Sequence, residues 1–146
     1  MTVEVEIVRH ASEELVDALG RLLPQLSAGA EPLDFAAVDR LARSEATTLL
    51  AARVRGEVVG TLSLVLFPVP AGVRARVEDV VVDSAARGQG VAAALTSEAL
   101  RLAGEAGART VDLTSRPDRE AANRLYQRLG FEARQSTVYR FTVPAS

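Results

Sequence analysis

The stretch Val77–Leu95, VEDVVVDSAARGQGVAAAL, decides the fold of this chain. Its first part is rich in valine, and such a continuous β-branched run predicts a buried strand. The glycine pair Gly88 and Gly90 follows, and small and apolar residues then predict a helix that begins at Val91. A strand, a glycine-rich turn and a helix N-terminus in this order favour an anion site, because the unpaired N–H groups of the first helical turn point toward negative charge.

Arg87 lies at the mouth of this turn and adds a full positive charge, which suits a phosphate group. A glycine pair before a helix is a weak signal alone, because the same residues also make an ordinary tight turn. A second motif further along the chain strengthens the functional interpretation.

Two motifs carry a resemblance to a known family. Arg87–Ala92, RGQGVA, matches the R/Q-x-x-G-x-G/A signature of the GNAT superfamily, the acyl-CoA-dependent N-acyltransferases, and Val77–Val82 resembles the fourth strand of that fold. Leu125–Phe131, LYQRLGF, resembles the LY-x-x-x-GF motif of the same family. The motifs stand in the family's order, and the resemblance covers roughly residues 46–142.

The hydrophobic pattern agrees with the α/β fold that the resemblance implies. It predicts strands at about residues 3–9, 47–54, 58–67, 74–82 and 109–114, with a last strand inside 131–143. It predicts helices after Ser12, after Asp34, from Val91 to about Gly107, and after Asp118. Pro24 is expected to kink or end the first helix at about Leu23. The expected fold is one mixed, mostly antiparallel sheet flanked by helices, in the order β-α-α-β-β-β-α-β-α-β, forming a single domain over residues 1–146.

Acetyl-CoA is the co-substrate that the resemblance implies, with no metal. The family geometry requires the fourth strand to splay from the fifth, so that its backbone can pair with the pantetheine arm. The glycine turn would hold the pyrophosphate. The cofactor contacts carried over from the family are Val80, Val81, Val82, Arg87, Gly88, Gln89, Gly90, Val91 and Ala92.

Two residues match the catalytic positions of the family. Glu78 occupies the place where many members put the base that takes a proton from the acceptor amine, with Asp79 or a bound water as the alternative. Tyr126 would protonate the leaving thiolate, and its reference pKa of about 10 lies above the thiol value of about 8.5. The structural alternatives are a surface charge for Glu78 and a core aromatic for Tyr126.

The sequence departs from the family at one cofactor contact. The family often has an asparagine seven residues before the tyrosine, and here Arg119 occupies that position. Either Arg119 replaces the contact through its charge, or Asn123 makes it from a shifted place. Arg116, which leaves the fifth predicted strand, is a further candidate to contact cofactor or acceptor.

Composition excludes several classes of function. The net charge is −2 and argues against bulk nucleic-acid binding, although all 17 basic residues are arginine. No cysteine is present, which excludes disulfides, thiolate metal sites and a cysteine acyl-enzyme. The single histidine, His10, is expected at the surface. No apolar run is long enough to span a membrane, and the acidic N-terminal stretch is unlike a signal peptide, so a cytoplasmic protein is expected.

The expected function is an N-acetyltransferase that moves an acetyl group from acetyl-CoA to an amine by direct transfer in a ternary complex. A non-catalytic acyl-CoA sensor on the same fold is one alternative. A dinucleotide-binding oxidoreductase is another, because residues 88–93 fit G-x-G-x-x-A and Asp112 follows at a suitable distance. Five residues separate the strand from Gly88, and only one more strand and helix follow the fifth strand, which weighs against an oxidoreductase. The amine, the acyl length and a homodimer stay open.

Overall fold

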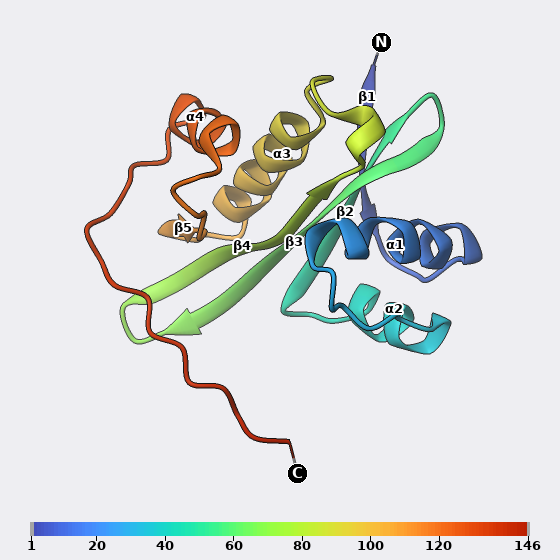
Figure 1. Cartoon of the computed structure of the whole chain (residues 1–146). Coiled ribbons are helices and arrows are strands. Elements are labelled where there is room, and N and C mark those ends of the chain that lie inside the picture. The colour runs from blue at the N-terminus through green and yellow to red at the C-terminus, as the bar shows by residue number, and fades with distance from the viewer. Residues whose placement is uncertain (1, 146) are drawn as a thin grey trace. The chain divides into compact units, whose positions relative to one another are not determined.

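The computed structural model describes residues 2–145, whose contacts divide into two compact units that meet between Thr114 and Ser115. Figure 1 labels the elements of both. The first unit contains β1 (Val3–Val8), α1 (Glu13–Leu26), α2 (Phe35–Ala42), β2 (Thr47–Val54), β3 (Glu57–Val69), β4 (Gly72–Val82), the 3₁₀ turn η1 (Ser84–Ala86), α3 (Val91–Glu105) and β5 (Thr110–Asp112). The second contains α4 (Glu120–Arg128). One domain over the whole chain stays a prediction.

A single sheet of five strands organises the first unit, in the spatial order β1-β2-β3-β4-β5. The first four strands are antiparallel neighbours, and β5 runs parallel to β4 because α3 joins them. The α/β fold with a mixed, mostly antiparallel sheet is therefore confirmed. The hairpin between β2 and β3 turns on Arg55 and Gly56, both with positive φ, which matches the twist of the strands it connects.

Helices cover both faces of the sheet (Figure 1). Alternate residues of β2 show why, since Leu50 and Ala52 pack in the α3 core whereas Leu49 and Ala51 pack in the core under α1 and α2. The central strands are thus apolar on both sides, as the valine-rich pattern predicted. The side chains of Leu22, Leu50, Leu62, Leu64 and Leu95 are completely buried.

Local signals place the helix starts of the first unit. The Ser12 hydroxyl accepts a hydrogen bond from the Leu15 N–H at 3.1 Å, and the Asp34 carboxylate accepts one from Ala37 at 2.8 Å. Of the kink or end expected near Leu23, the end is wrong, because α1 continues through Pro24 to Leu26. Proline in this last turn removes only the bond to the carbonyl of Gly20, and Gly20 is exposed, so water can replace it.

The second unit departs from the sequence prediction in two places. Asp118 is not the helix cap, since α4 begins at Glu120 with Arg119 at the N-cap position and no side-chain cap bond. The last strand expected inside 131–143 is absent, because no strand forms after α4 in the described residues. The alternation of side chains in this segment defines two faces of a possible strand. A strand also needs a neighbouring strand to pair with, which alternation does not supply. The later apolar side chains of this segment are exposed, with 91% for Tyr139 and 83% for Phe141.

Helix α4 ends in a Schellman motif at Gly130, the glycine of the second sequence motif. The Gly130 N–H donates to the carbonyl of Gln127, and the Phe131 N–H donates to that of Tyr126 at 2.9 Å. Gly130 has a φ of 106°. The Phe131 ring packs edge-on against Tyr126, with ring centroids 5.7 Å apart. Leu125–Phe131 is therefore a helix stop that fixes the backbone of Tyr126.

Gly130→Ala should destabilise the second unit by about 1–2 kcal/mol, because an L-residue is strained at this positive φ. Space is not the reason, since a Cβ at Gly130 would meet no atom within 4 Å. Urea denaturation followed by circular dichroism measures the change. Gly104→Ala is the matched control, because Gly104 lies exposed inside α3 and alanine should stabilise that helix by up to about 1 kcal/mol. Equal stability of the Gly130 variant and the parent would contradict the strain argument.

Candidate active site

A bulge in β4 changes which side chains face which side of the sheet. Thr61 of β3 pairs with Val81, but Ser63 pairs with Glu78, so two residues of β4 oppose one of β3. Asp79, at the bulge, has a φ of 51°. Ala75 and Val77 pack toward α3 before the bulge, whereas Val81 packs toward α1 and α2 after it. Strand alternation places Glu78 on the same face as Val81.

The Glu78 carboxylate is half exposed and has a cationic neighbour. The Arg76 Nη2 lies 3.3 Å from Glu78 Oε1, and the same nitrogen donates to the Thr114 hydroxyl at 3.3 Å. The Glu78 side chain keeps 44% exposure. The carboxylate is therefore held in place while remaining accessible to a ligand.

One edge of β4 lacks a partner strand over half its length in the first unit. The parallel pairing to β5 covers only Arg74–Arg76 with Thr110–Asp112. From Val77 to Val82 the strand has no such pairing, because β5 stops at Asp112. That the free backbone of this stretch pairs with the pantetheine arm, as the family geometry implies, stays a prediction. The backbone at Val80 and Val82 is where two amides could pair.

The glycine turn lies exposed between β4 and α3. Arg87, Gly88, Gln89 and Gly90 are all exposed, and both glycines have a φ of 80°. Gly90 is the N-cap of α3 and offers no side chain to the helix. The first helical hydrogen bond is donated by Ala94 to the carbonyl of Gly90, which leaves the N–H groups of Val91–Ala93 available to a ligand. This geometry agrees with an anion site.

Tyr126 lies in α4, and its side chain is buried, with 9% exposure. Burial raises the pKa of the phenol, and the positive charge of Arg119 partly opposes this rise. The hydroxyl therefore stays protonated, as a proton donor must, at neutral pH. The hydroxyl makes no hydrogen bond to the described residues of its own unit.

The two candidates for the displaced cofactor contact differ in their surroundings. Asn123 Nδ2 donates to the carbonyl of Arg116 at 3.0 Å and so holds the loop before α4. Its Oδ1 remains for a ligand. Arg119 is exposed at the N-cap position, where its guanidinium is accessible. Ser115, in the same loop, has a buried hydroxyl without a partner in the described residues.

Comparison with known proteins decides the family. The acetyltransferase (GNAT) family model matches residues 13–131. The chain belongs to the GNAT acetyltransferase family. Acetyl transfer is the general chemistry of this family, whose fold uses acetyl-CoA, and this GNAT protein is therefore of the acyltransferase class.

Solved structures similar to this GNAT chain carry different names. A transcriptional regulator from Bacillus halodurans C-125 is 27% identical, with a TM-score of 0.80 over 97% of this chain and 100% of that one. A ribosomal-protein-alanine N-acetyltransferase from Brucella melitensis biovar Abortus 2308 is 28% identical, with a TM-score of 0.74 over 97% and 100%. An aminoglycoside acetyltransferase from an uncultured soil metagenomic sample is 25% identical, with a TM-score of 0.77 over 100% of both chains. A search of the curated proteins gave no match.

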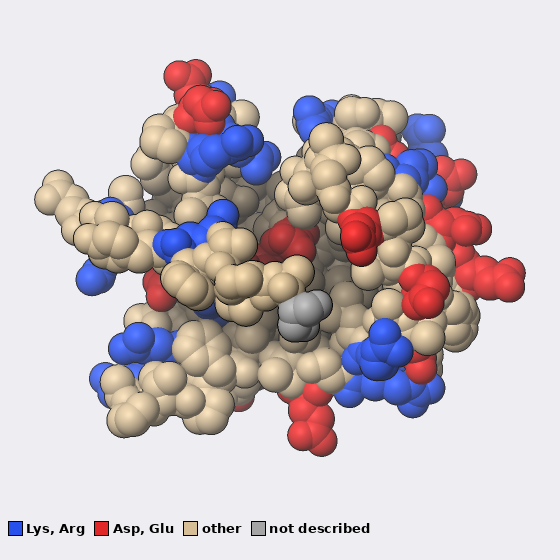
Figure 2. Space-filling model, turned by 60° about the horizontal axis from the view of Figure 1, so that its bottom comes forward, with Lys and Arg blue, Asp and Glu red and all other residues tan. Residues whose placement is uncertain are grey.

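Charges are mixed over this GNAT protein. Figure 2 shows acidic and basic side chains interspersed on the face drawn there. No group of three or more His, Asp or Glu residues placed to hold a metal ion occurs among residues 2–145. None of the helices described is long and apolar enough to cross a membrane.

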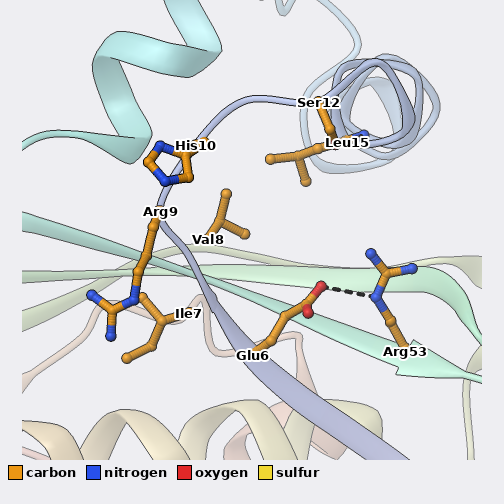
Figure 3. Close-up of a pocket in the computed structure, with 8 residues that line it drawn as sticks. All are labelled: Glu6, Ile7, Val8, Arg9, His10, Ser12, Leu15 and Arg53. Atoms are coloured by element: carbon orange, nitrogen blue, oxygen red, sulfur yellow. Dashed lines mark hydrogen bonds and ion pairs between the residues drawn. The ribbon is translucent and has the colours of Figure 1, made fainter.

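A hollow of about 280 Å³ lies where β1 leads into α1, and none of the predicted site residues lines it (Figure 3). Arg53 occupies its rim, but its guanidinium is already bonded to Glu6 at 2.8 Å and to both Glu14 oxygens at 2.8 Å. Those bonds hold the Glu14 pKa below its usual value. His10 is exposed beside this hollow, as expected.

Sequence reasoning missed a contact between α1 and the chain before the glycine turn. Gln25 Oε1 accepts the N–H of Ser84 at 2.9 Å, across 59 residues of sequence. A glutamine in the last turn of an amphipathic helix carries no signal of such a role. Only the three-dimensional packing reveals it.

Proposed function

We propose that this chain is an N-acetyltransferase that moves the acetyl group of acetyl-CoA to a primary amine of a small molecule, peptide or protein. The observation that carries the proposal is the exposed glycine turn at the uncapped start of α3, beside the unpaired edge of β4. Coenzyme A combines a pyrophosphate with a peptide-like arm. The glycine turn would bind the pyrophosphate, and the unpaired edge of β4 would pair with the arm. The cofactor residues are those from Val80 to Val82 and from Arg87 to Ala92, with Arg119 and Asn123 as further contacts.

The reaction is a direct transfer within a ternary complex. The amine nitrogen forms a bond to the thioester carbon, and the bond from that carbon to sulfur breaks. Glu78 accepts the proton that the amine loses, and a backbone N–H of β4 stabilises the oxyanion. Tyr126 donates a proton to the departing thiolate. The chain has no cysteine, so it offers no thiol for an acyl-enzyme intermediate.

The acceptor is to be found by a thiol-release assay with acetyl-CoA over a panel of amines. Two similar proteins are named as acetyltransferases of ribosomal-protein alanine and of aminoglycosides, so the panel includes peptides with a free α-amine and aminoglycosides. Polyamines and free amino acids complete it. Thiol release above the amine-free rate with at least one class is the expected result.

A non-catalytic acyl-CoA sensor is the second candidate, because a similar structure is named a transcriptional regulator. Such a module would bind acetyl-CoA in calorimetry but release no thiol with any amine. The retained Glu78 and Tyr126 favour the enzyme. Binding without turnover over the whole panel would decide for the sensor.

Glu78→Gln should lower kcat/KM, and most strongly at low pH. There an amine with a pKa of about 8–10 is mostly protonated and must lose a proton before it attacks. Acetyl-CoA affinity should stay at the parental value, since Glu78 lies before the bulge and apart from the glycine turn. A pH–rate profile measures the change.

Glu4→Gln is the matched control for this variant, because Glu4 is an exposed carboxylate of β1. Its profile should equal that of the parent. If the Glu78 variant also gives a profile parallel to the parent's, the base is Asp79 or a bound water instead.

A further inference from the structure

Side chains of α1 hold the segment that leads into the glycine turn. Gln25 Oε1 accepts the N–H of Ser84 at 2.9 Å. One helical turn earlier, the Arg21 Nη2 donates to the carbonyl of Val58 at 2.8 Å, and its Nε lies 3.4 Å from Asp83 Oδ2. Helix α1 thus reaches both β3 and the end of β4.

Each backbone N–H group of residues 83–86, the segment after β4, has a hydrogen-bond acceptor. The Asp83 N–H donates to Val59 at 2.8 Å, and the Asp83 carboxylate accepts the N–H of Ala85 at 3.1 Å. This bond, with the Arg21 contact, holds the Asp83 pKa below its usual value. The Ala86 N–H closes η1 on the Asp83 carbonyl at 2.8 Å. The N–H of Ser84 alone depends on a side chain from a distant element.

The glycine turn itself has no comparable support. Residues 87–90 are exposed, and two of the four are glycines in a left-handed conformation. The turn is bounded by two buried residues, Ala86 on one side and Val91 on the other. Its position is therefore set by its ends, with η1 at one end and α3 at the other.

We infer that Gln25 is a positioning residue for the phosphate-binding turn, with Arg21 supporting it. The inference rests on the proposed function, since the ligand of this turn is the pyrophosphate of coenzyme A. By fixing Ser84, Gln25 holds η1 against α1 and presents Arg87–Gly90 in one place. Gln25 touches no substrate in this scheme and acts through the turn.

Gln25→Met keeps the length of the side chain and removes its acceptor. The expected result is a rise of about threefold to tenfold in the KM for acetyl-CoA, the factor that corresponds to the net worth of one hydrogen bond. The kcat should stay at the parental value, because the reacting groups are untouched. The melting temperature should stay close to the parent's, because both Gln25 and Ser84 are exposed and water can replace the lost bond.

Gln25→Glu is the matched rescue, because the carboxylate retains an acceptor for the Ser84 N–H. Arg21, four residues earlier on the same helix, offsets the added charge. Its KM should lie within about twofold of the parent's, well inside the range of one lost bond. Hydrogen exchange at the Ser84 amide, measured without ligand, should be faster in the Met variant than in the parent and the Glu variant.

The outcomes separate the two proposals. Equal KM values for the Met variant and the parent, or unchanged exchange at Ser84, would overturn the positioning role while leaving the acetyltransferase proposal intact. If the parent itself fails to bind acetyl-CoA in calorimetry, the proposed function is wrong. Faster exchange with an equal rise of KM in the Met and Glu variants would also overturn the positioning role. The hydrogen-bond acceptor for the Ser84 N–H would then not explain the change in KM.

Discussion

Gly90→Glu should abolish acetyl-CoA binding while the protein stays folded. Gly90 is the N-cap of α3, and a Cβ built there meets no atom within 4 Å, so the new side chain has room within the protein. It would place bulk and negative charge at the start of the helix, where the proposal puts a pyrophosphate. Calorimetry with acetyl-CoA measures the loss, which should exceed about 100-fold in affinity, beyond the typical effect of one hydrogen bond.

Gly107→Glu is the matched control, which introduces the same side chain at the other end of α3. Gly107 follows α3 at its other end, has a φ of 81°, and likewise has open space around a Cβ. The substitution therefore brings the same backbone strain and the same charge. Its affinity for acetyl-CoA should match the parent's. Unchanged binding in the Gly90 variant would remove Arg87–Ala92 from the cofactor site.

Tyr126→Phe should reduce turnover by about 10²-fold or more, the usual scale for the loss of a general acid. The ring, with its edge-on contact to Phe131, is retained, and only the hydroxyl is lost. Stability should change by no more than roughly 1 kcal/mol, because the hydroxyl makes no hydrogen bond to the described residues of its own unit that could be lost. Acetyl-CoA affinity should barely change, since phosphates and pantetheine supply it. Single-turnover kinetics measures the chemical step.

Tyr139→Phe is the matched control, because Tyr139 is the second tyrosine of the chain and is 91% exposed. Its turnover should equal that of the parent. A Tyr126 variant that reacts at the parental rate under conditions where chemistry limits would make Tyr126 a core aromatic. The proton for the thiolate would then come from water.

The sequence predicted the structure well where the residues that determine an element lie close together in the chain. Strand β2 begins and ends at the expected residues, Thr47 and Val54, because an apolar run between polar boundaries fixes a central strand. Asp34 caps α2 as expected, since its carboxylate needs only a partner three residues away. Gly130 ends α4 for the same local reason.

Features that depend on distant partners were predicted poorly or not at all. The strand expected inside 131–143 needs a neighbouring edge, which no pattern within the segment specifies. The fifth strand was expected over residues 109–114, yet β5 spans only Thr110–Asp112. The hydrogen bond of Gln25 to Ser84 follows from packing alone. The candidate site could be named by motif, but its supporting contacts could not.

The bulge at Asp79 divides β4 into two segments that protein engineering must treat separately, because the order of residues facing each side of the sheet changes there. Before it, Ala75 and Val77 pack toward α3 and Glu78 lies on the other face, whereas after it Val80 and Val82 pack toward α3. Substitutions before the bulge on the face of Glu78 can thus be screened for new acceptors without disturbing the segment assigned to the cofactor. A single inserted or deleted residue has a different consequence: it exchanges the two faces downstream of its position and brings valine where charge is needed. Libraries that redesign this strand should therefore vary residue identity and keep its length fixed.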